Sequence, residues 1–77
     1  MMLLEKKTLY SVVSSYYNGT PQKYWFDSLK RARKFSKRDY SDKLVVHNFK
    51  NIWFKEDFLG TSYITQNNFA IYTYEND

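Results

Sequence analysis

The chain has 77 residues, with twelve Lys and Arg, eight Asp and Glu and no cysteine, and its net charge is +4. This length predicts one small domain, 1–77, with a modest core, and the absence of cysteine excludes disulfides and thiolate metal sites. Eight Tyr, six Phe and two Trp supply large apolar surfaces and exclude a disordered chain.

The charge is unevenly placed along the chain. Residues 1–43 hold ten bases against four acids, whereas residues 44–77 hold two bases against four acids. Such a dipolar molecule favours an oriented encounter with a negatively charged partner.

The first seven residues, MMLLEKK, have too short an apolar run for a signal peptide, and their bases follow that run. No segment approaches the roughly 20 apolar residues of a membrane span. We therefore expect a cytoplasmic protein with no membrane partner.

Two strands are predicted before the helix. Residues 8–17, TLYSVVSSYY, are rich in β-branched and aromatic types, and Asn18-Gly19 is a strong turn signal. Pro21 fits the loop that follows, and residues 23–26, KYWF, form the return strand of a hairpin.

One helix is predicted, from Asp27 to Arg38. Leu29, Ala32 and Phe35 recur at helical spacing, and Asp27 or Ser28 can cap the first turn. The other positions carry six bases without an acid: Lys30, Arg31, Arg33, Lys34, Lys37 and Arg38. One narrow face of the helix is therefore apolar and the rest is strongly cationic.

The remaining chain predicts short strands joined by turns. Residues 44–49 form a strand, Lys50-Asn51 makes a turn and residues 52–55 pair back. After a less regular link at 56–60, residues 61–66 and 69–74 form strands around a turn at Asn67-Asn68. Six runs are thus marked, and we expect them to form about five strands in the order β-β-α-β-β-β: an α+β fold with one helix on one face of a mostly antiparallel, five-stranded sheet.

One helix covers one face of such a sheet, so the other face must meet solvent, a second copy or a partner. We expect one set of side chains to face the helix: Leu44, Val46, Ile52, Phe54, Phe69 and Ile71. The opposite set would then face away: His47, Phe49, Trp53, Lys55, Tyr72 and Tyr74. Rings mixed with bases are typical of a binding surface. The alternative is that the sheet curls and buries some of these rings in a second small core.

The sequence offers little for catalysis or metal binding. His47 is the only histidine, it falls inside a predicted strand, and no nucleophile turn such as G-x-S-x-G is present. A histidine at such a position is typically a half-exposed packing residue. The acids form no cluster that would hold a hard cation, and two glycines are too few for a phosphate-binding loop. We therefore expect no enzyme, cofactor or metal.

Binding is the better-supported class of function. Five helical bases could follow a phosphate backbone or an acidic protein surface: Lys30, Arg31, Lys34, Lys37 and Arg38. The alternative is a solvated helix face that aids solubility. The helix lacks the Asn and Gln that read adenine, so contact with phosphates is favoured over sequence-specific reading of DNA. The second expected set of contact residues is Phe49, Trp53, Lys55, Tyr72 and Tyr74.

A hairpin, a helix that opens SLKRARKF at residues 28–35, and a later aromatic pair at Trp53-Phe54 together resemble a known class of protein. These are small, single-helix, sheet-rich proteins of phages and mobile elements, some of which are anti-CRISPR inhibitors. The resemblance covers most of the chain as a pattern, and it contains no motif from which a functional residue carries over. The hairpin and helix also resemble the arm-binding domains of phage integrases, which place three strands before the helix, whereas two are predicted here.

Three functions follow as hypotheses. The first is a phage-type inhibitor in the host cytoplasm that occupies a protein or nucleic-acid-binding surface of a host protein or ribonucleoprotein complex. The second is a nucleic-acid-binding module that contacts DNA or RNA phosphates through residues 28–38. The third is a self-associating structural protein that forms a homodimer.

Overall fold

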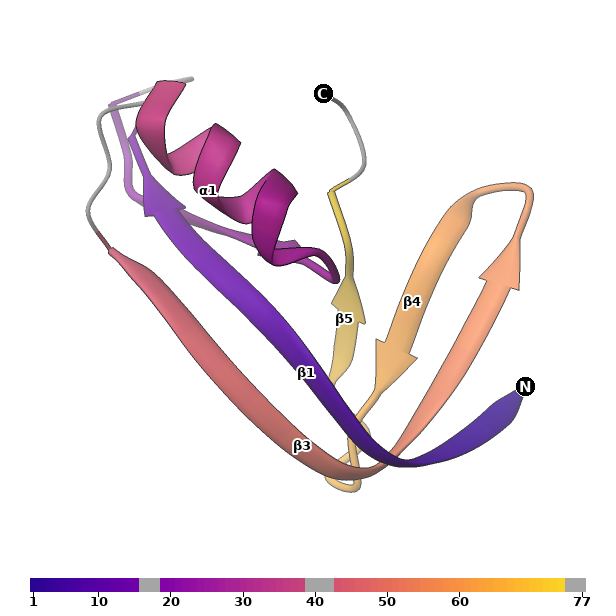
Figure 1. The fold of residues 1–77 in the computed structure, drawn as a ribbon. Coiled ribbons are helices and arrows are strands. Elements are labelled where there is room, and N and C mark those ends of the chain that lie inside the picture. The colour runs from indigo at the N-terminus through magenta and orange to yellow at the C-terminus, as the bar shows by residue number, and fades with distance from the viewer. Residues whose placement is uncertain (16–18, 39–42, 75–77) are drawn as a thin grey trace.

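A computed structural model describes residues 1–15, 19–38 and 43–74. Five antiparallel strands form one sheet in the order β2-β1-β3-β4-β5, and a single helix follows β2 (Figure 1). This confirms the predicted α+β class and the order of elements. The elements are β1 (Met2–Ser14), β2 (Gln22–Phe26), α1 (Leu29–Arg38), β3 (Leu44–Asp57), β4 (Gly60–Ile64) and β5 (Ala70–Tyr72).

The two central strands are much longer than the sequence suggested. β1 begins at Met2 instead of residue 8, and β3 runs without interruption from Leu44 to Asp57. The predicted turn at Lys50-Asn51 is therefore wrong, and two of the predicted runs are one strand. Pairing with β1 keeps a single register across this point, because Lys6 lies opposite Lys50 and Leu4 lies opposite Ile52.

Asn51 explains why the sequence suggested a turn. Its φ is +53°, in the left-handed region that asparagine tolerates better than most residues. One such residue bends the strand without reversing it, and β1 and β3 bend together (Figure 1). The bend also interrupts the alternation of side chains, so Ile52 joins a different core from Leu44.

The first core lies between α1 and the sheet. Val12, Phe26, Ala32 and Phe35 are buried there, and neighbouring partly buried rings include that of Tyr74. Ring-to-ring distances from Tyr74 are 5.4 Å to Phe35 and 5.8 Å to Phe26. Tyr74 therefore faces the helix, opposite to the expectation, and helps to close this core.

The second core lies on the other side of the sheet. Leu9, Ile52, Tyr63 and Ile71 are buried in it, and the half-buried side chains packed against it are Leu4, Trp25, Phe49 and Phe54. Three side chains expected to face the helix, Ile52, Phe54 and Ile71, lie here instead. Two others, Val46 and Phe69, are exposed, which leaves Leu44 as the member of that set that packs against the helix core.

The sheet curls until its outer strands meet. Thr73 forms a parallel bridge with Trp25 of β2, and the Tyr74 N–H donates a 2.7 Å hydrogen bond to the Trp25 carbonyl. The strands β4 and β5 thereby cover much of the face opposite α1. The expectation of an open aromatic face is wrong for Phe49 and Tyr74. The curled alternative, with a second small core, describes Phe49, whereas Tyr74 packs in the first core.

The local signals at the start of the helix, at Gly19 and at the turn before β5 are confirmed. The Arg31 N–H donates to the Ser28 hydroxyl at 3.3 Å, so Ser28 is the cap of α1. Gly19 has a φ of +74°, and its N–H donates to the Ser15 carbonyl. The turn before β5 is present, with Asn68 at a φ of +59°. The predicted strand residues 16–17 and the turn residue Asn18 lie outside the described residues.

Candidate binding surfaces

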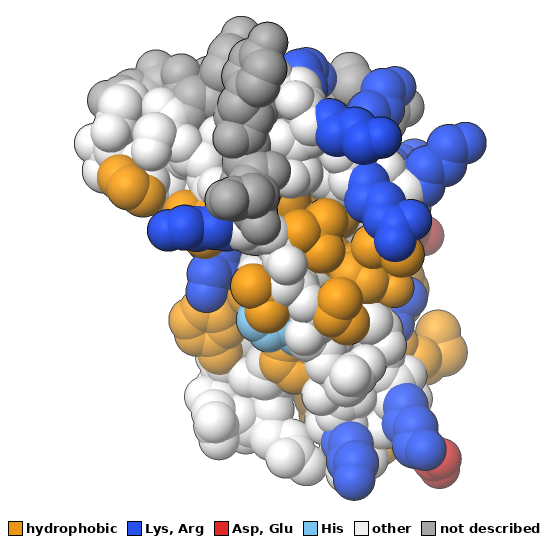
Figure 2. Space-filling model, turned by 60° about the vertical axis from the view of Figure 1, so that its left-hand side comes forward, with side chains coloured by type: hydrophobic (Ala, Val, Ile, Leu, Met, Phe, Trp, Pro, Cys, Tyr) orange, Lys and Arg blue, Asp and Glu red, His pale blue; other side chains and the backbone are white. Residues whose placement is uncertain are grey.

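The cationic face of α1 is exposed to solvent. All six helical bases are exposed, while Ala32, Phe35 and Ser36 are buried against the sheet. Lys and Arg side chains gather on one side of the upper part of the molecule, with few acidic side chains in view (Figure 2). Four of them line a shallow depression on the helix together with Leu29: Lys30, Arg33, Lys34 and Lys37.

The spacing of these four bases aligns them. Positions i, i+3, i+4 and i+7 fall on one side of a helix and span about 10 Å along its axis. Within the described part of the chain, no acid forms an ion pair with Lys30, Lys34 or Lys37. The two other predicted bases differ, because the guanidinium of Arg38 lies 5.2 Å from the Phe35 ring and Arg31 also has an interaction partner.

The second predicted set of contact residues is divided: Trp53, Lys55 and Tyr72 share one face of the sheet, where Lys55 and Tyr72 both lie opposite Ser62, and the other two lie elsewhere. Trp53, Lys55 and Tyr72 are exposed, whereas Phe49 is half-buried in the second core and Tyr74 packs in the first. Trp53 is 42% exposed and lies opposite exposed Leu3 on the neighbouring strand. These five residues therefore do not form one continuous surface.

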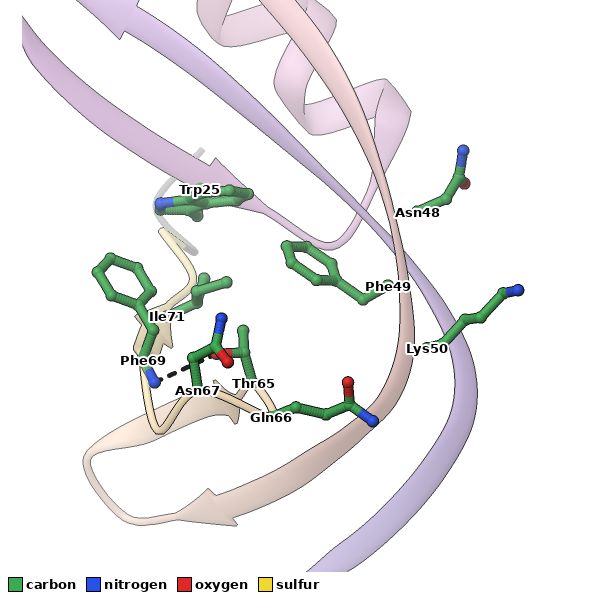
Figure 3. A pocket seen from close by; sticks show the side chains of 9 residues that line it. All are labelled: Trp25, Asn48, Phe49, Lys50, Thr65, Gln66, Asn67, Phe69 and Ile71. Carbon is green, nitrogen blue, oxygen red and sulfur yellow. Dashed lines mark hydrogen bonds between the residues drawn. The ribbon is translucent and has the colours of Figure 1, made fainter.

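A hollow of about 540 Å³ opens beside the second core. Trp25, Phe49, Phe69 and Ile71 form its apolar walls, and the turn before β5 closes one end, where the Phe69 N–H donates to the Thr65 hydroxyl at 3.2 Å (Figure 3). Trp25 and Phe49 come within 6.2 Å, ring centre to ring centre. The volume is within the range of small-molecule and side-chain pockets.

The strand that borders this hollow has two different sides. Phe49 points into the hollow, while the side chains of Asn48 and Lys50 point away from it (Figure 3). On that outer side, Asn48 accepts a 2.9 Å hydrogen bond from Thr8, and Lys50 lies directly opposite Lys6. A second, smaller hollow of about 300 Å³ lies along these residues.

The most exposed apolar side chains are at a site that sequence reasoning missed. Phe58 is 95% exposed and Leu59 is 83% exposed, at the two-residue turn between β3 and β4. The Asp57 carboxylate accepts the Leu59 N–H at 2.8 Å, and Gly60 has a φ of +123°. Asp and Gly at the ends of a four-residue run are a turn signature that could have located this tip.

His47 has a partner that the sequence did not indicate. Its Nε2 lies 2.8 Å from the Ser11 hydroxyl, and its ring lies 4.6 Å from that of Trp25. Burial lowers the pKa of His47 below its ordinary value of 6.5, and the positive charge of Lys23 lowers it further. Ser11 is only 1% exposed, so the hydrogen bond between the two side chains is largely shielded from solvent.

No cluster of metal-ligating side chains occurs among the residues that the structure describes. In the same residues, no helix is long and apolar enough to cross a membrane. Comparisons with protein-family models, with curated proteins and with solved structures found no match for this chain.

Proposed function

We propose that this protein is a non-enzymatic, nucleic-acid-binding domain that lays α1 along a phosphate backbone. The observation that carries the proposal is the exposed row of Lys30, Arg33, Lys34 and Lys37, without a described acid in contact with its three lysines. A row of about 10 Å faces roughly three phosphates of one DNA strand, at 3.4 Å of rise per phosphate.

The size of the row sets the expected strength of binding. Three phosphate contacts predict a slope of about −3 for the logarithm of the binding constant against the logarithm of the salt concentration. Such binding is weak and not sequence-specific, because lysine and arginine on phosphates carry no base information. The helix supports this role mechanically, since Phe35 and Ala32 hold its apolar side in the first core.

Fluorescence anisotropy with labelled 30-mer duplex and single-stranded DNA, at 50 and 200 mM salt, tests the proposal. The variant Lys30→Gln/Lys37→Gln should weaken binding at both salt concentrations and reduce the duplex slope by up to about 1.8. The matched control, Lys23→Gln/Lys55→Gln, removes two charges outside α1 and should change the slope much less. Equal effects of the two pairs, or no binding at 50 mM salt, would overturn the proposal.

The inhibitor hypothesis is a second candidate, favoured by the exposed apolar tip at Phe58-Leu59 and the exposed Trp53. The positive charge of α1 limits which surface of a host complex such an inhibitor would bind. Nucleic-acid channels of proteins are themselves basic, so a cationic helix suits the nucleic acid or an acidic surface of a ribonucleoprotein complex. Binding to such a complex that persists at high salt and is lost in Trp53→Ala would support this candidate over the first.

A further inference from the structure

Among the strands that the structure describes, half of β3 has a neighbour on only one side. β1 pairs with β3 from Leu44 to Phe54, whereas β4 pairs only with Trp53–Asp57. Among the described strands, none lies along the other edge of residues 44–51. Backbone N–H and C=O groups along an open edge of this kind can pair with another extended chain. Residues 44–50 offer about 23 Å of such an edge, at roughly 3.3 Å per residue.

The two sides of this edge favour different side chains in a chain that pairs with it. On one side is the hollow walled by Trp25, Phe49 and Phe69 (Figure 3). On the other side Lys6 and Lys50 lie directly opposite each other, an unfavourable like-charge pair. Neither lysine has an ion-pair partner in the described part of the chain.

We propose that the open edge of β3 binds an extended peptide segment of a partner protein as an added strand. Successive side chains of a strand point to opposite sides, so such a peptide would place apolar residues in the hollow and acidic residues beside Lys50, with Lys6 one strand further away on β1. Backbone hydrogen bonds supply affinity in this mode of recognition, and pockets for alternate side chains supply specificity.

The charge of the edge argues against a second copy of this chain as the occupant. Residues 44–51, which form the open edge, contain one lysine and no acid, so two such edges side by side would bring together only basic and neutral side chains. An acidic and apolar peptide complements both sides of the edge. This proposal is independent of nucleic-acid binding by α1, because it uses neither the helix nor its bases.

The probe is the peptide acetyl-DVEFEVD-amide, which alternates acidic and apolar residues. Its matched control has the same composition in the order DDEVVFE, which keeps the charge and removes the alternation. Two-dimensional NMR titration on the full chain should show saturable shifts for residues 44–50 with the first peptide. Amide exchange should slow at alternate residues of this stretch at least tenfold, and residues 2–8 of β1 serve as the internal control. N-methylation of alternate peptide amides should abolish binding in one register and spare it in the other.

Paired variants locate the contact. Phe69→Ala, which removes an exposed wall of the hollow, should weaken binding about tenfold or more, as for a central apolar contact. Phe58→Ala removes an equally large ring at the distant tip and should leave affinity unchanged. Lys30→Gln/Lys37→Gln should also leave it unchanged, which separates this site from α1.

Three results would overturn the proposal. The first is the absence of saturable shifts at 1 mM peptide. The second is equal binding of the rearranged peptide or shifts centred on α1, which would mean charge attraction to the helix. The third is slowed exchange at residues 44–50 that grows with protein concentration in the absence of peptide, which would mean that a second copy occupies the edge.

Discussion

Among the described residues, His47 lies in surroundings that disfavour its protonated form. Burial and the charge of Lys23 lower its pKa in the folded protein, whereas in the unfolded chain it titrates near 6.5. Between the folded value and 6.5 the unfolded chain therefore binds more protons than the native state. Stability is accordingly complete above about pH 6.5 and falls as the pH drops through and below that value.

We expect the melting temperature to decrease between pH 7.5 and pH 5.5. In His47→Gln this decrease should be smaller, because the variant has no imidazole to protonate. Thermal unfolding followed by circular dichroism at several pH values measures both. Above pH 5.5 most carboxylates stay ionised, so the difference between the two proteins reports on His47. The same pH dependence in both proteins would contradict the assignment.

Asn51 shows how one residue shapes an element. Its positive φ bends β3, and a β-branched residue at this position would be strained by roughly 1–2 kcal/mol. We expect Asn51→Val to lower the free energy of unfolding by that amount and Asn51→Gly to be close to neutral. Chemical denaturation measures the change. Lys50→Val is the control, since it should cost nothing and removes one of two like charges at opposed positions of β1 and β3. A neutral Asn51→Val would contradict the role of the bend.

The same residue marks the limit of what could be predicted at the scale of elements. The helix and the order of strands follow from local spacing and were predicted correctly, and the observed cap, Ser28, is one of the two predicted candidates. Lys50-Asn51 was interpreted as a turn because asparagine permits left-handed φ in turns and in bends alike. Local sequence does not separate the two, because the register that keeps β3 continuous is set by pairing with β1. The N-terminal part of β1 was missed because MMLLEKK lacks the alternation of apolar and polar residues that marks a strand, so its pairing with β3 has no local signal.

At the scale of the whole molecule, closure depends on Tyr74. Its backbone bonds to Trp25, and its ring contacts Tyr24, Phe26 and Phe35. We expect Tyr74→Ala to cost about 2–3 kcal/mol, somewhat less than the 3–5 typical of a fully buried aromatic residue. Tyr72→Ala, at a site 73% exposed two residues earlier, should cost no more than about 0.5 kcal/mol.

The free energies of unfolding of these two variants, from urea denaturation, provide the comparison. Equal losses would show that the meeting of the outer strands contributes little to stability. The sequence could not assign Tyr74 to the helix side, because its orientation is decided by contact between β2 and the chain after β5. These segments are some 50 residues apart and have no local signal in common. The candidate surfaces show the same difference. The helical bases were predicted from local spacing, whereas the hollow forms because the sheet curls, which local sequence does not indicate.

The continuity of β1 and β3 through both cores has a consequence for how the protein comes apart. β1 contributes Leu9 to the second core and Val12 to the first. β3 contributes Ile52 to the second core and Leu44 to the first. Neither core can lose its packing without loosening a strand that the other one shares. We therefore expect the two small cores to unfold together, in one cooperative transition between the folded and unfolded states.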